Sequence, residues 1–167
     1  RCAEPVTMNE LASSLPRQLL AGAQYALFRT GPLTSTAITA GAFIRSDPLL
    51  ERPDIQINMF SWSAMERTSE EVIPHPFPAF TMSPVHLRPD CDGSVRIKSP
   101  DPLAPPAISY EFLRSPYDQQ AILHGMRVCR QIANQPALSR YMVEEVVPGP
   151  TVASDEELLA DVRARGI

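Results

Sequence analysis

The chain has 167 residues, of which 44% are hydrophobic and 20% are charged, and its formal net charge is −4. This composition is typical of a globular protein, which excludes general disorder, and the length suffices to bury a core. The scattered lysines and arginines form no basic stripe, which argues against nucleic acid as a partner. No apolar run reaches the roughly 18 residues that a membrane span requires.

The cysteines and the two ends of the chain indicate its setting. Cys2, Cys91 and Cys129 are widely spaced without a CxxC pair, which indicates reduced thiols in a cytoplasmic protein rather than disulfides or a zinc site. Cys129 is interpreted as a small buried hydrophobic residue rather than a reactive thiol. The chain begins at Arg1 without an initiator methionine or a signal peptide and stops just after a predicted helix, so we expect an excised piece.

The first elements are a helix and a strand. Pro16 suits a first helical turn, and leucines recur after it at helical spacing, which predicts a helix over 16–29. The β-branched stretch 34–46 predicts a strand, in which Gly41 allows a bulge or the close approach of another group.

Two further strands follow, separated by an irregular stretch. Residues 54–62 alternate between isoleucine or methionine and polar or aromatic residues, the period of a strand with two different faces. Residues 63–79 lack such a period and are interpreted as a lid-like loop of low order. Residues 80–87 predict another strand, with Pro84 at a sheet edge or a bulge.

The second half opens with a strand over 94–99 that has one solvent-facing side, followed by an extended apolar run to Phe112. A helix is predicted from Ser115 as N-cap, with Pro116 at the first position and Asp118 completing a capping box. Its predicted buried stripe consists of Ile122, Met126, Cys129, Ile132 and Ala133.

Residues 143–147 predict a short strand, and Ser154 with Glu157 three residues later predicts a last helix to about 164, closed by Gly166. Helices and short strands do not alternate strictly along the chain. This order favours an α+β fold, a mostly antiparallel β-sheet flanked by helices, in a single domain over 1–167.

No sequence motif indicates a complete active site. The chain contains no GxGxxG, GxxxxGK[ST], HExxH or GxSxG pattern, so dinucleotide, nucleoside triphosphate, metalloprotease and esterase sites are not indicated. His75, His86 and His124 fall on a loop, a strand and a helix and are interpreted as ordinary surface or packed histidines. We therefore expect no catalytic residue and no metal site within this chain.

A family resemblance rests chiefly on LRPDCDGSVRIKSPDPLAPPAISYEFLRSPYDQQAILHGMRVCRQI (87–132), which contains a V-x-I strand, S-x-DP, P-x-I and a helix start in that order. This string resembles the glucose-methanol-choline (GMC) oxidoreductases, flavoenzymes that oxidise alcohols with FAD. The resemblance extends to RTGPLTSTAITAGAFIRS (29–46), PDIQINM (53–59) and residues 136–166. It implies that about 86–167 is the start of the family's C-terminal homology region.

The resemblance implies an enzyme that lies partly outside this chain. In the family, the FAD-binding GxGxxG lies far upstream, and the catalytic histidine of an H-P-x-G-T motif follows shortly after the position of Ile167. The chain would then be the substrate-binding domain, with the FAD-binding domain of the same polypeptide as its partner and an oligomer as a further possibility. The parent would oxidise a primary alcohol to an aldehyde by hydride transfer to flavin, and the fragment alone would be inactive.

The resemblance also implies a substrate pocket. Thr39 stands where choline-oxidising members carry a glutamate, and Ser83 stands where they carry a pocket histidine. Loss of the carboxylate removes an attraction for a quaternary ammonium, which favours a neutral alcohol over choline. Phe60 and Trp62 are candidate pocket walls, with core packing as their alternative role. For Thr39 and Ser83 the alternative is that of plain strand residues.

Two other functions remain open at this point. The chain could be a stand-alone binding or interaction module with the same fold. It could also belong to a family member that retains FAD but catalyses a lyase reaction. The first alternative predicts a short reading frame, and the second predicts aldehyde release without bleaching of the flavin.

Overall fold

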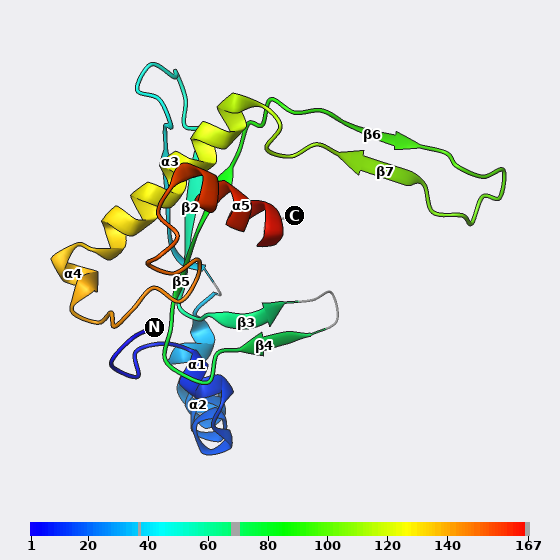
Figure 1. Cartoon of the computed structure of the whole chain (residues 1–167). Helices are drawn as coiled ribbons and strands as arrows, with labels where there is room; N and C mark the ends of the chain where they lie inside the picture. The colour runs from blue at the N-terminus through cyan, green and yellow to red at the C-terminus, as the bar shows by residue number, and fades with distance from the viewer. Residues whose placement is uncertain (37, 68–70, 166–167) are drawn as a thin grey trace.

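The computed structural model describes residues 1–36, 38–67 and 71–165. One long helix crosses a three-stranded sheet, and two hairpins extend from this centre (Figure 1). The elements are α1 (Asn9–Ala12), α2 (Leu15–Phe28), η1 (Pro32–Thr34), β1 (Ile38–Ile44), β2 (Ile55–Phe60), β3 (Ala64–Arg67), β4 (Val72–Pro74), β5 (Thr81–His86), β6 (Gly93–Arg96), β7 (Ala107–Tyr110), α3 (Pro116–Ala133), α4 (Pro136–Ser139) and α5 (Asp155–Arg165). The predicted α+β class is confirmed, because every strand pair among the described residues is antiparallel.

The central sheet has the strand order β1-β2-β5. The predicted alternation along β2 is confirmed, since Ile55 and Ile57 are 0% and 3% exposed and pack with Cys129 of α3. Pro84 lies on β5, an edge strand, as predicted, where the proline interrupts no second ladder. Helix α3 thus covers one face of the sheet and supplies the core.

The predicted helices are present, with one error at a cap. Helix α2 ends where Arg29 takes a left-handed conformation at φ 54°. Ser115 caps α3 as predicted, its Oγ accepting the N–H of Tyr117 at 3.1 Å. The predicted capping box with Asp118 is wrong, because that carboxylate accepts the backbone N–H of Asp90 at 2.8 Å instead. Aspartate is one methylene shorter than the glutamate that a capping box uses.

The capping box predicted for α5 is confirmed. The N–H of Ser154 donates to the Glu157 carboxylate at 3.0 Å, and the N–H of Glu157 donates to the Ser154 Oγ at 3.3 Å. Helix α5 contacts α3, and its Leu158 is 1% exposed. Gly166, predicted to close this helix, lies outside the described residues.

The prediction of a low-order loop over 63–79 is wrong, because β3 and β4 form an antiparallel hairpin there. Its register shifts between Ala64 and Glu66, which interrupts the period of two on which strand prediction depends. Residues 68–70, within the predicted loop, are outside the described part of the chain.

The strand predicted over 143–147 is also wrong. Only an isolated bridge between Cys2 and Met142 forms next to it. The bridge is antiparallel, so Arg1 lies opposite Val143, whose N–H donates to the Arg1 carbonyl oxygen at 2.9 Å, and this single flanking bond does not make a strand. Side chains also hold the stretch, since Arg1 pairs with Glu144 and Arg130 pairs with Glu145, each at 3.1 Å.

Strands β6 and β7 form a second hairpin, which extends away from the sheet and its helices (Figure 1). The expectation that one side of 94–99 would be buried is wrong within this chain. Val95 and Ile97 are 70% and 91% exposed, and all four residues of β7 are exposed. The alternation of side chains is present, but the surface that would cover it is not among the described residues.

Candidate functional site

The sheet face opposite α3 carries the candidate site. In an antiparallel sheet, directly paired residues share a face, and so do residues two apart along a strand. Asn58 is paired with Gly41 on one side and with Ser83 on the other. No helix or strand of the described residues packs extensively on this face. We call it the open sheet face and define it by Phe43, Gln56, Asn58, Phe60, Ser83 and Val85.

Polar groups form a row across the open sheet face. The Gln56 Nε2 donates to the Asn58 Oδ1 at 2.7 Å, which orients the Asn58 amide with its nitrogen free to donate. Neither that nitrogen nor the Ser83 hydroxyl has a hydrogen-bond partner within the described residues. Gly41 places no side chain above Asn58, so the row is accessible from the β1 side. This arrangement can hold an oxygen-bearing group of a small molecule.

Three of the four predicted pocket residues lie on or beside this face. Ser83 and Phe60 belong to it, and Thr39 sits in a bulge of β1 between the residues that pair with Phe60 and Met59. The bulge is therefore at Thr39 rather than at Gly41, where the sequence pattern allowed one. The Thr39 Oγ1 donates to the Met59 carbonyl oxygen at 3.2 Å, so its hydroxyl is partly committed to the sheet.

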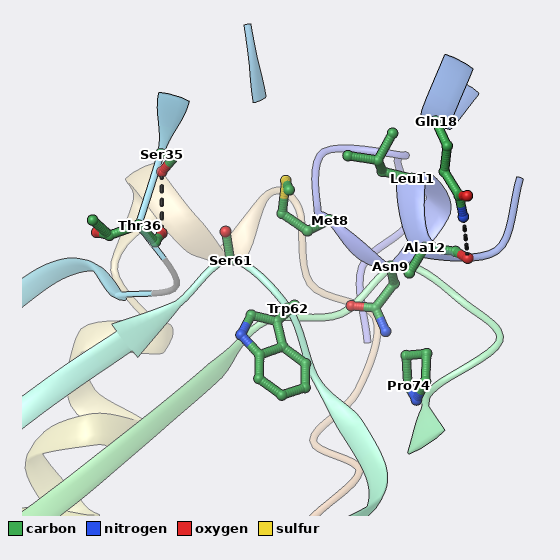
Figure 2. Close-up of a pocket in the computed structure, with 10 residues that line it drawn as sticks. All are labelled: Met8, Asn9, Leu11, Ala12, Gln18, Ser35, Thr36, Ser61, Trp62 and Pro74. Carbon is green, nitrogen blue, oxygen red and sulfur yellow. Dashed lines mark hydrogen bonds between the residues drawn. The ribbon is translucent and has the colours of Figure 1, made fainter. Parts of the chain in front are cut away.

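Trp62, the fourth predicted residue, lies just beyond the end of β2. Its ring meets Phe60 edge to face with centroids 6.4 Å apart. It lines a separate cavity of about 430 Å³ between α1, the start of α2 and the β3–β4 hairpin (Figure 2). The lining residues are Met8, Asn9, Leu11, Ala12, Gln18, Ser35, Thr36, Ser61, Trp62 and Pro74.

The polar side chain of Asn9 at this cavity is used by the fold. Its Nδ2 donates to the carbonyl oxygens of Ser63 and His75 at 2.7 and 3.0 Å, and its Oδ1 accepts the N–H of Ser63. His75 is 7% exposed and lies 3.0 Å from the Ser63 Oγ. Both side chains anchor the β3–β4 hairpin, which supports the interpretation of His75 as a packed histidine.

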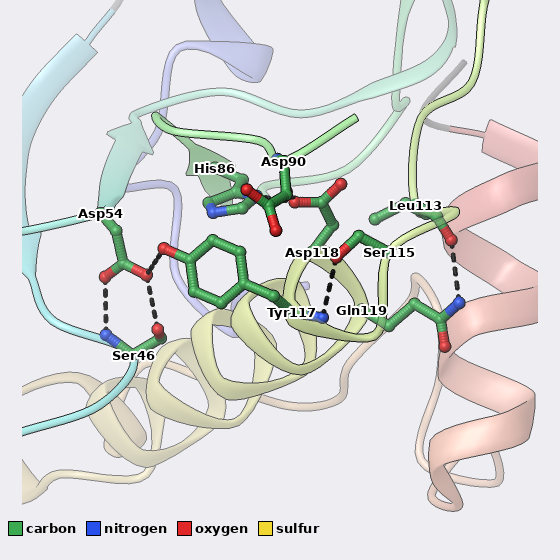
Figure 3. A network of polar contacts seen from close by, with 9 residues as sticks. All are labelled: Ser46, Asp54, His86, Asp90, Leu113, Ser115, Tyr117, Asp118 and Gln119. Carbon is green, nitrogen blue, oxygen red and sulfur yellow. Dashed lines mark hydrogen bonds and ion pairs between the residues drawn. The ribbon is translucent and has the colours of Figure 1, made fainter. Parts of the chain in front are cut away.

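A buried polar network joins the sheet to the start of α3 (Figure 3). Asp54 is 1% exposed and accepts hydrogen bonds from Ser46 and from the Tyr117 hydroxyl, the latter at 2.9 Å. Burial alone raises the pKa of Asp54, but the bonds from Ser46 and Tyr117 outweigh it and lower the pKa on balance. Burial, followed by the bond to Asp54, raises the pKa of Tyr117 to about 12.

His86 and Asp118 form a second part of this network. The His86 Nδ1 lies 3.5 Å from the Asp118 Oδ1, with the two side chains 8% and 1% exposed. The groups of the network come from the loop between β1 and β2, from β5 and from α3, so the network fixes how the helix lies on the sheet. His86 does not face the open sheet face, because its partner Ile55 belongs to the core side.

Gln56 and Asn58 were not predicted as site residues from the sequence. A signal was present, since both are polar residues at alternate positions of a strand whose other face is isoleucine. The pair of buried Asp54 and half-buried Tyr117 was also missed. Its members are 63 residues apart, and sequence spacing does not reveal such a contact.

The described residues contain no cluster of metal-ligating side chains, and the two described cavities have little positive charge in their lining. No group of three or more metal-ligating side chains occurs among them, and Cys2, Cys91 and Cys129 are free thiols. A second cavity of about 320 Å³ is lined by Asp90, Asp92 and Glu111 and by Arg114, which forms an ion pair with Glu111, so its lining is negative on balance and disfavours a diphosphate. The cavity beside Trp62 has no cationic lining residue.

Comparisons with known proteins agree with the resemblance seen in the sequence. Residues 89–167 match the family described as GMC oxidoreductase. The chain is 30% identical over 153 residues to an alcohol dehydrogenase [acceptor] of Pseudomonas putida. It is 35% identical over 162 residues to an oxygen-dependent choline dehydrogenase of Citrobacter koseri. The recognition of the GMC oxidoreductase family in the sequence is therefore confirmed.

These matches cover 92% and 97% of the chain but only 27% and 28% of the two relatives, so the chain spans little more than a quarter of their length. The fold is similar to that of formate oxidase, with a TM-score of 0.71 at 20% identity, covering 98% of this chain and 33% of the other. It is also similar to pyridoxine 4-oxidase from Mesorbium loti, with a TM-score of 0.63 at 20% identity, covering 75% and 25%. No described helix has the length and apolar character needed to cross a membrane.

Proposed function

We propose that this chain forms the substrate-facing wall of an FAD-dependent alcohol oxidoreductase that converts a primary alcohol to an aldehyde. The observation that carries the proposal is the open sheet face, on which a polar row stands beside three residues predicted as pocket lining. Membership of the GMC oxidoreductase family supports the reaction class. The free thiols support the cytoplasmic location predicted from the sequence.

In this proposal, the chain binds and orients the alcohol. The Asn58 amide nitrogen and the Ser83 hydroxyl are donors on neighbouring strands and would hold an oxygen of the substrate. Phe43 and Phe60, at the two ends of the polar row, would exclude water and contact the carbon chain. Positioning of this kind lowers the entropic cost of reaching the reactive geometry.

The residues of the open sheet face favour a neutral alcohol. Quaternary ammonium groups are bound by carboxylates and aromatic faces acting together. The open sheet face contains aromatic rings but no carboxylate, and Thr39 supplies only a hydroxyl. Choline is therefore a poorer candidate than an uncharged alcohol of similar size.

We assign FAD and the catalytic histidine to the rest of the parent polypeptide, and the small positive charge in the lining of the two described cavities supports this for FAD. When bound there, FAD supplies hydride acceptance from the alcohol carbon. The isolated chain should consequently bind no flavin and turn over no alcohol.

The test uses the parent protein, purified and mixed anaerobically with a panel of neutral and cationic alcohols. Bleaching of the visible flavin bands by neutral alcohols supports the proposal. Aldehyde release without bleaching would instead indicate lyase chemistry. A colourless parent that oxidises no alcohol would leave the fold as a binding module and refute the proposed function.

Substitution of Thr39 by glutamate tests where the pocket lies. Thr39→Glu places a carboxylate beside Phe60 at the open sheet face and should raise the kcat/KM for cationic alcohols relative to neutral ones by about tenfold, the equivalent of one modest charge pair. Ser109→Glu adds the same charge on the exposed β7 and serves as the matched control. Equal preference in the two variants would remove Thr39 from the pocket.

A further inference from the structure

The β6–β7 hairpin and its connection, residues 93–110, project from the body of the protein and are called the arm (Figure 1). Val95 is paired with Ile108, so the two side chains share a face. Ile97 and Tyr110 stand two residues further along and continue that face. Their exposed fractions are 70% for Val95, 59% for Ile108, 91% for Ile97 and 59% for Tyr110. These four residues define the apolar arm face.

The other face of the arm is polar. Ser94 is paired with Ser109, and Arg96 is paired with Ala107. Lys98 follows on the same side as Arg96, two residues further on. One face is therefore suited to water and the other to burial, which is the pattern of a strand pair with one side packed against a neighbour.

The arm does not supply its own neighbour. A hairpin of two strands is marginally stable in water unless a further strand or helix covers it. No helix or strand among the described residues packs extensively on β6 or β7 other than each on the other. Contiguous exposed apolar side chains of this kind mark interaction surfaces.

The turn at the base of the arm is fixed to the body of the protein, so the direction in which the arm extends is constrained there. Leu113 lies three residues after the end of β7, is buried, and adopts a left-handed backbone at φ 58°. Its carbonyl oxygen accepts the Gln119 Nε2 at 2.9 Å and the Arg163 Nη2 at 3.4 Å. Helices α3 and α5 thus both hold the turn from which the arm extends.

The connection at the tip of the arm is unsuited to pairing with an added strand. It contains prolines at positions 100, 102, 105 and 106, none of which has an N–H to donate to such a strand. An added strand could pair only along β6 or β7, whereas the apolar arm face is open to any packed partner.

We propose that the apolar arm face packs against the remaining polypeptide of the longer oxidoreductase to which this chain belongs. The inference rests on the proposed function. It is supported by the lengths of the relatives, of which this chain spans 27% and 28%. The fold alignment with formate oxidase covers 98% of this chain but 33% of the other, so a similar fold occurs within a chain that has about twice as much polypeptide besides.

A second copy of the chain is the competing occupant of the apolar arm face. A surface on the same polypeptide is present at an effective concentration in the millimolar range, whereas a second copy is present at the protein concentration. At micromolar protein, a surface of equal affinity on the same chain therefore occupies the arm first. A surface on the same polypeptide is therefore favoured over a second copy of the chain as the partner of the apolar arm face.

The test measures cysteine labelling at matched positions in the full-length parent. Ile108→Cys and Val95→Cys place a thiol on the apolar arm face, and Ser109→Cys and Ser94→Cys place one on the neighbouring residues of the polar face. Peptide mass spectrometry separates these sites from Cys91. We expect labelling by a maleimide to be at least about tenfold slower on the apolar face in the native parent, and equal on both faces in urea.

Each outcome decides the proposal. Equal native rates on the two faces, or a reading frame that adds no polypeptide to this chain, would overturn it. Slow labelling of the apolar face that becomes fast on dilution, together with a dimer mass by light scattering, would assign the face to a second copy and also overturn it. Slow labelling in a parent that bleaches no flavin would uphold the docking while refuting the proposed function.

Discussion

Helix α3 crosses the central sheet at Gly125, and replacement of this glycine by alanine tests the packing on which the open sheet face depends. A Cβ at this position would lie 2.7 Å from the Pro84 Cβ and 3.3 Å from the Ile55 Cγ2. The Pro84 ring cannot rotate away, so helix and sheet must separate, at an overpacking cost of about 1–3 kcal/mol. Alanine favours the helix by about 1 kcal/mol over glycine, which offsets part of this cost.

Gly22 of α2 provides the matched control, because an added Cβ there meets no atom within 4 Å. Gly22→Ala should raise the free energy of unfolding by about 0.5–1 kcal/mol, whereas Gly125→Ala should lower it by up to about 2 kcal/mol. Urea unfolding can be followed through Trp62, the only tryptophan of the chain. Gly125→Ala being as stabilising as Gly22→Ala would falsify the close crossing.

Ser154→Ala removes a capping hydroxyl of α5 and should lower the free energy of unfolding by about 1 kcal/mol, compared in urea with exposed Ser139→Ala. The folded pKa of Asp54 is lowered, so its stabilising effect exists above the usual carboxyl range and is lost as pH falls through the folded value. Asp54→Asn should therefore flatten the acid side of a stability profile, and an unchanged slope would contradict this. Burial raises the pKa of Cys129 to about 11, so iodoacetamide at about pH 8 should label half-buried Cys91 before it.

The elements that could be predicted from the sequence are those whose signals are local. The alternation of β2, the N-cap of α3 at Ser115 and the capping box of α5 depend on residues within a few positions of one another. The edge position of Pro84 was also predictable, because proline lacks the N–H that a central strand needs.

The elements that could not be predicted depend on contacts between distant residues. Residues 143–147 have strand composition, but their backbone pairs only with Arg1 and their side chains pair with Arg1 and Arg130, so no ladder forms. Asp118 has the position of a capping residue, yet the N–H of Asp90, 28 residues earlier, is its partner. For the arm, the predicted alternation of side chains is present, but the expected burial of one face is wrong within this chain. Alternation indicates that one face is covered, but it does not identify the segment that covers it.

The substrate selectivity of the open sheet face is linked to the packing of the apolar arm face. A hydrogen-bond donor facing water contributes little net free energy to binding, since it exchanges one partner for another. The same donors at Asn58 and Ser83 would discriminate between substrates only if water were excluded and the local dielectric lowered. Nothing in the described residues covers that face, so its selectivity must depend on whatever polypeptide closes over it. If the apolar arm face helps to hold that polypeptide, charged substitutions at Val95 or Ile108 should weaken alcohol selectivity, although neither residue belongs to the open sheet face.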